Sequence, residues 1–345
     1  MWAVNKIEPT VAQPAIAFDK MTLLLNGPHD DNSNMRYSKV YYPIGFGVEI
    51  QTNDPEVLEA ASEIWGQPPS KHAGVTVQIR IHIDHNGARS CPPSPKFHIA
   101  RHLISTVADA ENQAHCDLNA GFGFASLTSA ALKYRLYFRY HFLESMTMVL
   151  VSAKHAPALH AACVNRNSQG MLLCGESGAG KSTLAYACAR AGFTYVSDDA
   201  SYLLRDADHP RVAGQSHKIR FRPSSRELFP ELLGRELTPR LEGKPSIEVP
   251  TSDFPGLNTA QESRVHYLIL LRRGVSARAR LTPISTTTAL EGFHELLYPE
   301  PEIRRQQIAS LQKLRALKAF EFEYWDLVEA VDCLEGLSRT QGGCE

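Results

Sequence analysis

One segment, residues 175–183, has the residue types and spacing of a phosphate-binding loop. The fixed positions of the pattern G-x-x-x-x-G-K-[ST] are filled by Gly175, Gly180, Lys181 and Ser182. In such a P-loop, or Walker A motif, the backbone N–H groups of the loop and of the next helix point at one place, where the helix dipole favours an anion. We therefore predict that a polyphosphate binds to Gly175, Glu176, Ser177, Gly178, Ala179, Gly180, Lys181, Ser182 and Thr183.

Three residue types in this segment have separate tasks. Gly178 and Gly180 can adopt backbone conformations that other residues avoid, and they let phosphate oxygens approach the main chain. Lys181 supplies a mobile positive charge for the outer phosphates, and the Ser182 hydroxyl is suited to ligate Mg²⁺. The motif thus predicts a site for a nucleotide and its magnesium ion.

A pair of carboxylates, Asp198 and Asp199, follows the next predicted strand. We expect a strand at 171–174, then the loop, a helix at 182–191 and a strand at 193–197. The two strands of such a crossover run parallel, so their carboxyl ends lie at one edge of the sheet and the aspartates arrive next to the loop. One carboxylate there can hold Mg²⁺, and the other can accept a proton from an attacking hydroxyl.

A histidine, His160, lies in a predicted strand at 158–164, before the loop. A polar turn at 165–170 joins this strand to the one that leads into the loop, so the two can form a hairpin. If the pairing is symmetric about the turn, His160 stands opposite Gly175, whereas a slip of one residue turns it to the other face. The position of His160 therefore depends on the register.

The surrounding elements predict two domains, which suits a chain of 345 residues. We expect an N-terminal arm at 1–36, a smaller α+β domain of unknown role at 37–152, and an α/β domain with the P-loop at 153–345. Residues 222–262 are rich in Pro, Ser, Glu and Thr and predict a long excursion from the sheet, of the kind that forms substrate loops or lids.

Individual elements follow from periodicity and turn residues. In the first domain we expect strands at 40–52, 75–83 and 117–127, helices at 55–65 and 136–153, and a loop at 92–95. In the second we expect further strands around 212 and at 218–221, 265–271, 278–285 and 319–325, and helices at 288–297, 302–317 and 327–337. The helix at 136–153 is expected to connect the domains.

The composition indicates a globular protein without a strong electrostatic field. Lys and Arg number 36 and Asp and Glu 37, giving a net charge of −1, so we expect neither nucleic-acid nor membrane binding. The most apolar segment, 136–153, contains Arg139, His141 and Glu144 and is too short and too charged to span a bilayer. The 7 cysteines form no C-x-x-C pair and the N-terminus has no signal-peptide pattern, which predicts a cytoplasmic protein with reduced thiols.

Taken together, these motifs resemble the catalytic domain of HPr kinase/phosphorylase and its relatives. The resemblance rests on residues 159–162, 172–182, 192 and 197–199. It implies a P-loop kinase domain of the HPr-kinase type, with the strand, P-loop and helix in a mixed sheet, and ATP and Mg²⁺ as cofactors. Many relatives form oligomers, so the resemblance is compatible with a homo-oligomer.

The same resemblance implies a role for each site residue. Lys181 and the loop amides would bind the phosphates of ATP, and Ser182 with Asp199 would hold Mg²⁺. Asp198 would be the base that takes the proton from a substrate serine hydroxyl, and His160 would lie near the transferring phosphate. The expected catalytic residues are therefore Asp198, His160 and Lys181. Because the sequence has no N-K-x-D guanine motif, we expect ATP rather than GTP.

The sequence departs from the family in two places. No run of the type R-P-G-R-N-L follows the site, and the nearest segment, 222–226, does not fit; residues 1–150 do not resemble the usual N-terminal domain. These departures count against the phosphorylase reaction and against HPr as the acceptor. What remains is similar to divergent HPr-kinase-like proteins, some of which phosphorylate a serine of a biosynthetic precursor peptide. We expect transfer to a serine, or a similar hydroxyl, of a small protein or peptide.

Two other functions stay open at this point. A small-molecule kinase would use the same phosphate-binding groups and differ only in its acceptor pocket. A non-catalytic protein, in which ATP controls binding or assembly, needs the metal ligand but not a second carboxylate, so the paired aspartates favour a kinase.

Overall fold

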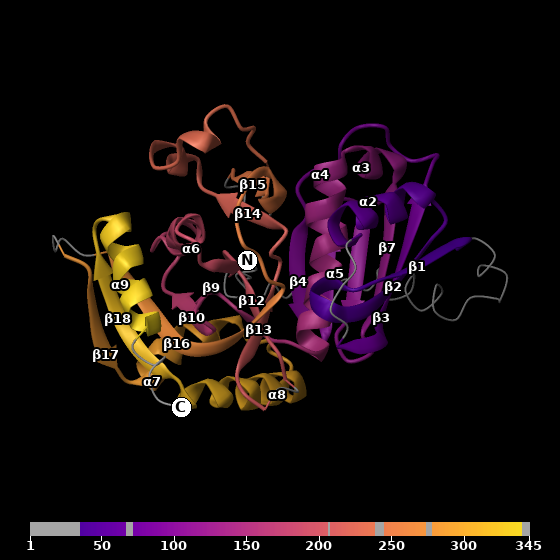
Figure 1. Ribbon diagram of the computed structural model, residues 1–345. Helices are drawn as coiled ribbons and strands as arrows, with labels where there is room; N and C mark the ends of the chain where they lie inside the picture. The colour runs from indigo at the N-terminus through magenta and orange to yellow at the C-terminus, as the bar shows by residue number, and fades with distance from the viewer. Residues whose placement is uncertain (1–34, 67–71, 206–207, 239–244, 274–277, 340–345) are drawn as a thin grey trace. The chain divides into compact units, whose positions relative to one another are not determined.

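The computed structural model describes residues 35–66, 72–205, 208–238, 245–273 and 278–339. The described chain divides into two compact units, and the boundary falls between Lys154 and His155 (Figure 1). Each unit is mixed α/β. The expected N-terminal arm lies outside the described residues except for its last two positions.

The N-terminal unit contains a seven-stranded sheet with the order β1-β2-β3-β7-β6-β5-β4. Strands β2, β3 and β7 are parallel neighbours, and the other pairs are antiparallel. The strands are β1 Tyr37–Tyr41, β2 Phe46–Thr52, β3 Ala73–Asp84, β4 Lys96–Ala100, β5 Leu103–Val107, β6 Gln113–Asp117 and β7 Phe122–Thr128. The helices are α2 Pro55–Trp65, α3 Ser129–Lys133, α4 Arg135–Phe138 and α5 Glu144–Lys154.

Local signals explain which expectations hold in this unit. Helix α2 has the predicted bounds, because the Asp54 carboxylate accepts a hydrogen bond from the N–H of Glu56 and caps the first turn. The strand expected at 40–52 is wrong: a turn at Pro43–Gly45 divides it into β1 and β2. The strand expected at 117–127 is also wrong at its start, because β6 ends at Asp117 and a turn precedes β7.

The helix expected at 136–153 is a run of shorter helical segments. A π-helical turn, Arg139–Leu143, separates α4 from α5. Helix α5 is buried over nearly all of its length and packs on β3, β6 and β7 of its own unit. No helix in the described part of the chain is long and apolar enough to cross a membrane.

The C-terminal unit is built on a nine-stranded mixed sheet. Its path is β11-β9-β10-β16-β13-β12-β8, and β18 pairs with the later part of β16 and with β17. The strands are β8 Ala158–Leu159, β9 Ala162–Arg166, β10 Gln169–Cys174, β11 Thr194–Ser197, β12 Ser201–Leu203, β13 Arg211–Gly214, β16 Glu262–Arg273, β17 Arg280–Ile284 and β18 Lys318–Tyr324. The helices are α6 Lys181–Arg190, α7 Thr286–Leu290, α8 Pro301–Gln312 and α9 Leu327–Arg339.

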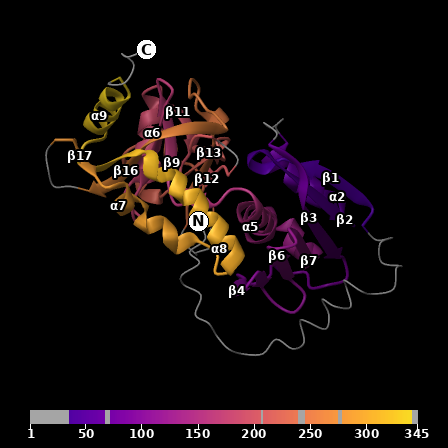
Figure 2. The same cartoon turned by 90° about the horizontal axis from the view of Figure 1, so that it is seen from below.

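Alternating side chains of this sheet form two separate cores. On one face, Val164, Leu173 and Ile269 belong to the core that includes residues of α6 and α9. On the other face, Cys163 and Leu172 belong to the core that includes α7 and the end of α8. Figure 2 shows these two helix pairs on opposite sides of the sheet. Both faces are therefore covered, which explains why β10 and β16 read as continuous apolar runs.

The hairpin of β9 and β10 determines which strand ends meet. Asn165 pairs with Gly170, as the symmetric register predicts. Strand β11 pairs with β9 in the antiparallel sense, so β10 and β11 point the same way with β9 between them. Their carboxyl ends, Cys174 and Ser197, consequently emerge at one edge of the sheet.

The excursion expected at 222–262 does leave the main sheet, but it ends earlier than expected, because Thr259 bridges to Tyr195 of β11 and Glu262 begins β16. Within the described part of this segment, β15 (Ile247–Pro250) pairs only with β14 (Lys218–Phe221) in a small sheet of their own. An aromatic cluster anchors this segment on α6. The centroid of the Tyr186 ring lies 4.8–4.9 Å from the ring centroids of Phe221, Phe229 and Phe254. Such T-shaped and tilted contacts add to apolar burial and fix the segment beside the P-loop helix.

A glycine in β10 provides a test of this strand arrangement. A Cβ atom at Gly170 would lie 2.0 Å from the carbonyl oxygen of Arg264 in β16. We expect Gly170→Ala to lower the free energy of unfolding by about 3 kcal/mol, measured by urea denaturation, because two backbones must separate. The control is Gly336→Ala in α9, where a Cβ meets nothing within 4 Å; it should raise stability by about 0.5–1 kcal/mol. Equal effects of the two substitutions would contradict the close pairing.

Candidate phosphate-binding site

The predicted phosphate loop joins β10 to α6 at this sheet edge. Gly175, Gly178 and Gly180 have φ angles of +142°, +95° and +97°, which are strained for residues with a side chain. A Cβ at Gly180 would also lie 2.8 Å from the Tyr324 hydroxyl, at the end of β18. The glycines at 178 and 180 thus have the conformational role that the sequence predicts.

The amino group of Lys181 is the centre of the loop. It donates hydrogen bonds to the carbonyl oxygens of Gly175 (2.7 Å) and Glu176 (3.0 Å), and its Nζ lies 3.0 Å from Nε2 of His160. The residue is only 5% exposed. Burial is the main cause that lowers the pKa of Lys181, with a smaller contribution from Arg222, while Asp199 acts in the opposite direction.

His160 links Lys181 to Asp199. Its Nδ1 lies 3.3 Å from the main-chain oxygen and 3.4 Å from a carboxylate oxygen of Asp199. Because Lys181 donates to Nε2, the neutral ring carries its proton on Nδ1 and donates it to Asp199. Burial, then the charge of Lys181, lowers the pKa of His160, and Asp199 partly offsets this effect.

The structure places His160 at the loop by a route that the sequence did not predict. The expected strand at 158–164 is interrupted, because β8 ends at Leu159 and β9 begins at Ala162. β8 pairs with β12 rather than with β10, so His160 lies in the bend between two strand pairings and not in the hairpin ladder. From its position in this bend, the His160 ring reaches the amino group of Lys181.

The two aspartates have different partners. A carboxylate oxygen of Asp198 accepts a hydrogen bond from the backbone N–H of Arg220 (2.6 Å), in β14. The main-chain oxygen of Asp198 accepts from the Ser182 hydroxyl at 3.2 Å, which ties the end of β11 to the start of α6. Asp199 faces His160 instead. The two adjacent carboxylates therefore have different surroundings: that of Asp198 contacts β14, and that of Asp199 faces His160.

The residues proposed as metal ligands, Ser182 and Asp199, suit a cation that brings other ligands with it. In the described chain, no group of three or more His, Cys, Asp and Glu residues could hold a metal by itself. Mg²⁺ usually takes one or two carboxylates together with phosphate oxygens and water, so this donor set fits Mg²⁺ bound with a polyphosphate.

Several contacts of the site come from β14 and the segment after it, and the sequence does not predict that these residues lie beside the loop. Arg222 donates to the Ser177 hydroxyl at 3.0 Å and adds a second cation beside the loop. The half-buried Glu248 accepts a hydrogen bond from Arg220 Nε at 2.7 Å and lies 3.6 Å from Lys218 Nζ. These pairings span 28 or more residues, and no local pattern predicts them.

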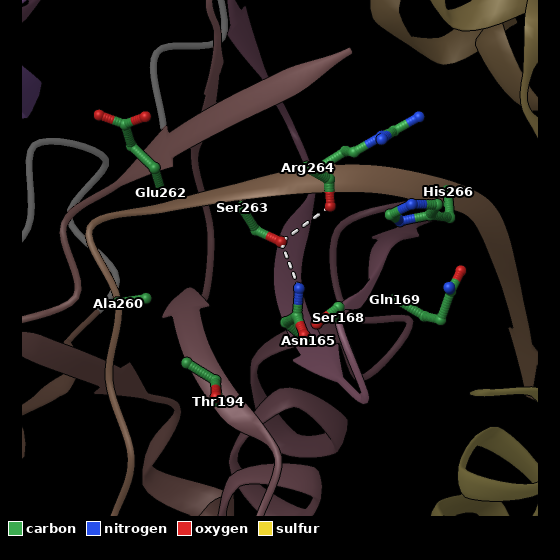
Figure 3. Close-up of a pocket in the computed structure, with 9 residues that line it drawn as sticks. All are labelled: Asn165, Ser168, Gln169, Thr194, Ala260, Glu262, Ser263, Arg264 and His266. Atoms are coloured by element: carbon green, nitrogen blue, oxygen red, sulfur yellow. Dashed lines mark hydrogen bonds between the residues drawn. The ribbon is translucent and has the colours of Figure 1, made fainter. Parts of the chain in front are cut away.

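A pocket of about 560 Å³ lies elsewhere in the same unit (Figure 3). It is lined by Gln169 and Thr194, at the starts of β10 and β11, and by Ser263 and His266 of β16. Since β10 and β11 run from this pocket toward the phosphate loop, the pocket is at the opposite edge of the sheet. It is not part of the phosphate-binding site.

No protein-family model matches the chain, and no curated protein sequence matches it. Among solved structures, the Hpr(Ser) kinase/phosphatase from Coxiella burnetii is similar at 17% sequence identity and a TM-score of 0.31. The likeness covers 53% of this chain and 88% of that protein. At this level it carries no conclusion about activity, so the function must be inferred from the site.

The chain of contacts through His160 predicts how its pKa responds to substitution. Lys181→Met should raise the pKa of His160, and Asp199→Asn should lower it further, because the two charges act in opposite directions. Histidine NMR titrations measure both changes. His115, whose pKa is lowered by burial alone, serves as the internal control and should not move.

The lowered pKa of His160 also affects the stability of the folded chain. A histidine whose pKa is lower in the folded chain stabilises it fully above about pH 6.5, the unfolded value, and loses this contribution as the pH falls. We therefore expect the free energy of unfolding to fall less steeply below pH 6.5 in His160→Gln than in the wild type. An unchanged slope would contradict a buried, neutral His160.

Proposed function

We propose that this protein is an ATP- and Mg²⁺-dependent kinase of the HPr-kinase-like type, which transfers a phosphoryl group to a serine, or a similar hydroxyl, of a small protein or peptide. The observation that carries this proposal is the meeting of Lys181, Asp198 and Asp199 at one sheet edge, with the two carboxylates held by different partners. A phosphate-binding site alone would need no such arrangement.

The phosphates of ATP would lie against the N–H groups of residues 175–183. In this proposal Lys181 turns from the carbonyls of Gly175 and Glu176 to the outer phosphates, where its charge offsets theirs. Ser182 and Asp199 would hold Mg²⁺, which would supply charge neutralisation for the phosphates when bound. Arg222 is near enough to the loop to contribute a further positive charge.

Asp198 would act as the general base. The acceptor oxygen attacks the terminal phosphorus, its proton passes to the Asp198 carboxylate, and the bond between that phosphorus and the bridging oxygen breaks to release ADP. The hydrogen bond from Arg220 N–H fixes the orientation of this carboxylate. Most of the rate enhancement would come from positioning and charge neutralisation.

His160 would stabilise the arrangement around the transferred group. Its neutral ring, with the proton on Nδ1, orients Asp199 and presents Nε2 to Lys181. When Lys181 moves to the phosphates, the ring stays beside them as a polar contact. This role needs the neutral form of His160, which its lowered pKa favours.

Asp198→Asn tests the base assignment. We expect the rate of phosphoryl transfer to fall by about 10²- to 10⁴-fold while the affinity for ATP stays near that of the wild type, since asparagine keeps the shape but cannot take the proton. Transfer is measured by intact-mass analysis of peptides and proteins encoded by neighbouring genes, and ATP affinity by calorimetry. The matched control is Asp332→Asn on the exposed face of α9, which should change neither. Wild-type turnover in Asp198→Asn would remove this residue from the base role.

Asp199→Asn tests the metal assignment separately. We expect this variant to need a higher Mg²⁺ concentration for half-maximal transfer, because one anionic ligand is lost while the phosphates and Ser182 remain. The measurement is a Mg²⁺ titration at fixed ATP, with Asp332→Asn again as the control. An unchanged Mg²⁺ requirement in Asp199→Asn would contradict the assignment.

If the wild type transfers no phosphoryl group to any protein or peptide, the two other functions, a small-molecule kinase and an ATP-controlled binding protein, are tested next. If ATP binds and no acceptor protein gains mass, a screen of small alcohols and amino acids for ADP release tests a small-molecule kinase. Capture of a partner only in the presence of ATP, without any transfer, would indicate an ATP-controlled binding protein.

A further inference from the structure

The phosphate loop accounts for one end of a nucleotide, and an exposed tryptophan lies at the same edge of the sheet. Strand β18 runs parallel to β16, and β16 runs parallel to β10, so all three end at the edge that carries the loop. β18 ends at Tyr324, whose hydroxyl is the atom that approaches Gly180 of the loop. Trp325 is the next residue along the chain.

The helices that follow the strands also place this residue beside the loop. α6 starts directly after the phosphate loop, α9 starts directly after Trp325 and Asp326, and the two helices pack against each other (Figure 1). Both begin at the same sheet edge. The axes of packed helices lie about 8–10 Å apart, a separation that the ribose and the first phosphate together can span between a base and the outer phosphates.

Trp325 is held in place although it is exposed. The Asp326 carboxylate caps α9 by accepting hydrogen bonds from the N–H groups of Val328 (2.8 Å) and Glu329 (2.9 Å). Tyr324, on the other side, is buried. The backbone at Trp325 is therefore fixed between a strand and a capped helix.

The exposure of these side chains is unusual. Trp325 is 76% exposed, and Val328, in the first turn of α9, is 69% exposed. Tryptophan is highly buried on average, so a largely exposed one beside a polar site is a candidate ligand surface, whereas single exposed aliphatic side chains such as Val328 are common. Ligands of open α/β sheets bind outside the carboxyl ends of the strands, which is where this pair lies.

We propose that Trp325 is the platform on which the purine base of the nucleotide stacks, with Val328 extending its apolar surface. This inference rests on the proposed function, because it assigns the base end of the same nucleotide. The flat indole offers a π-face to any purine, so contact with Trp325 gives affinity for the base without choosing between adenine and guanine.

Two ligands separate the base from the phosphates. Calorimetry with Mg²⁺ measures the binding of ATP and of inorganic tripolyphosphate, which has the phosphates and no base. We expect Trp325→Ala to weaken ATP binding by roughly 5- to 150-fold, the loss of one base–aromatic stack, and to leave tripolyphosphate binding unchanged. Trp325→Phe should keep most of the ATP affinity. The control is Tyr37→Ala, which removes another exposed aromatic side chain, in β1, and should change neither affinity.

Three results would overturn the inference. Trp325→Ala could bind ATP as tightly as the wild type, or lose ATP and tripolyphosphate affinity in equal measure, which would mean that it acts through the loop. In either case, phosphoryl transfer by the wild type would still support the proposed function. If the wild type binds neither ligand, the proposed function and this inference fail together.

Discussion

The candidate phosphate-binding site depends on a buried positive charge, the amino group of Lys181. A lysine that is 5% exposed costs free energy unless polar groups surround it, and here two loop carbonyls and His160 do so. The carbonyls belong to the loop after β10, His160 to the bend after β8 and Lys181 to the start of α6, so the interaction connects these three parts of the chain. The same amino group is the one that a phosphate would attract. The contacts that stabilise the site without ligand are therefore those that a nucleotide would replace.

The strand order explains how the remaining groups reach this charge. Because β9 lies between β10 and β11 and is antiparallel to both, Asp198 and Asp199 end on the same edge as the loop, while the turn at 165–170 lies at the far edge. Asp199 then meets His160, and Asp198 meets the N–H of Arg220 in a small sheet outside the main one. One carboxylate can act as a base and its neighbour as a metal ligand only if their surroundings differ. The hydrogen bond from β14 to Asp198 makes the surroundings of the two carboxylates different.

The sequence could predict what depends on local chemistry. The P-loop glycines, the Asp54 cap of α2 and the register of the β9–β10 turn each follow from residues close together in the chain, and the structure has all three. The sequence could not predict features that depend on contacts between residues far apart in the chain. The division of β8 from β9 depends on β12, and the contacts of Arg222 with Ser177 and of Tyr324 with Gly180 join segments 45 or more residues apart. The antiparallel strands β4 and β5 are not predicted by local pattern, because β4 alternates over only five residues and β5 has two polar residues, Ser105 and Thr106, side by side.

The position of a bound nucleotide relative to Lys181, Asp198 and Asp199 tests the proposed site most directly. A crystal structure of the protein with Mg²⁺ and a non-hydrolysable ATP analogue would show it. We predict that the phosphates lie against the N–H groups of residues 175–183 and that Lys181 Nζ moves from the Gly175 carbonyl to the outer phosphates. Ser182 and Asp199 should lie next to the Mg²⁺. A nucleotide bound away from the loop, or phosphates on the loop with the metal remote from Asp199, would contradict this assignment.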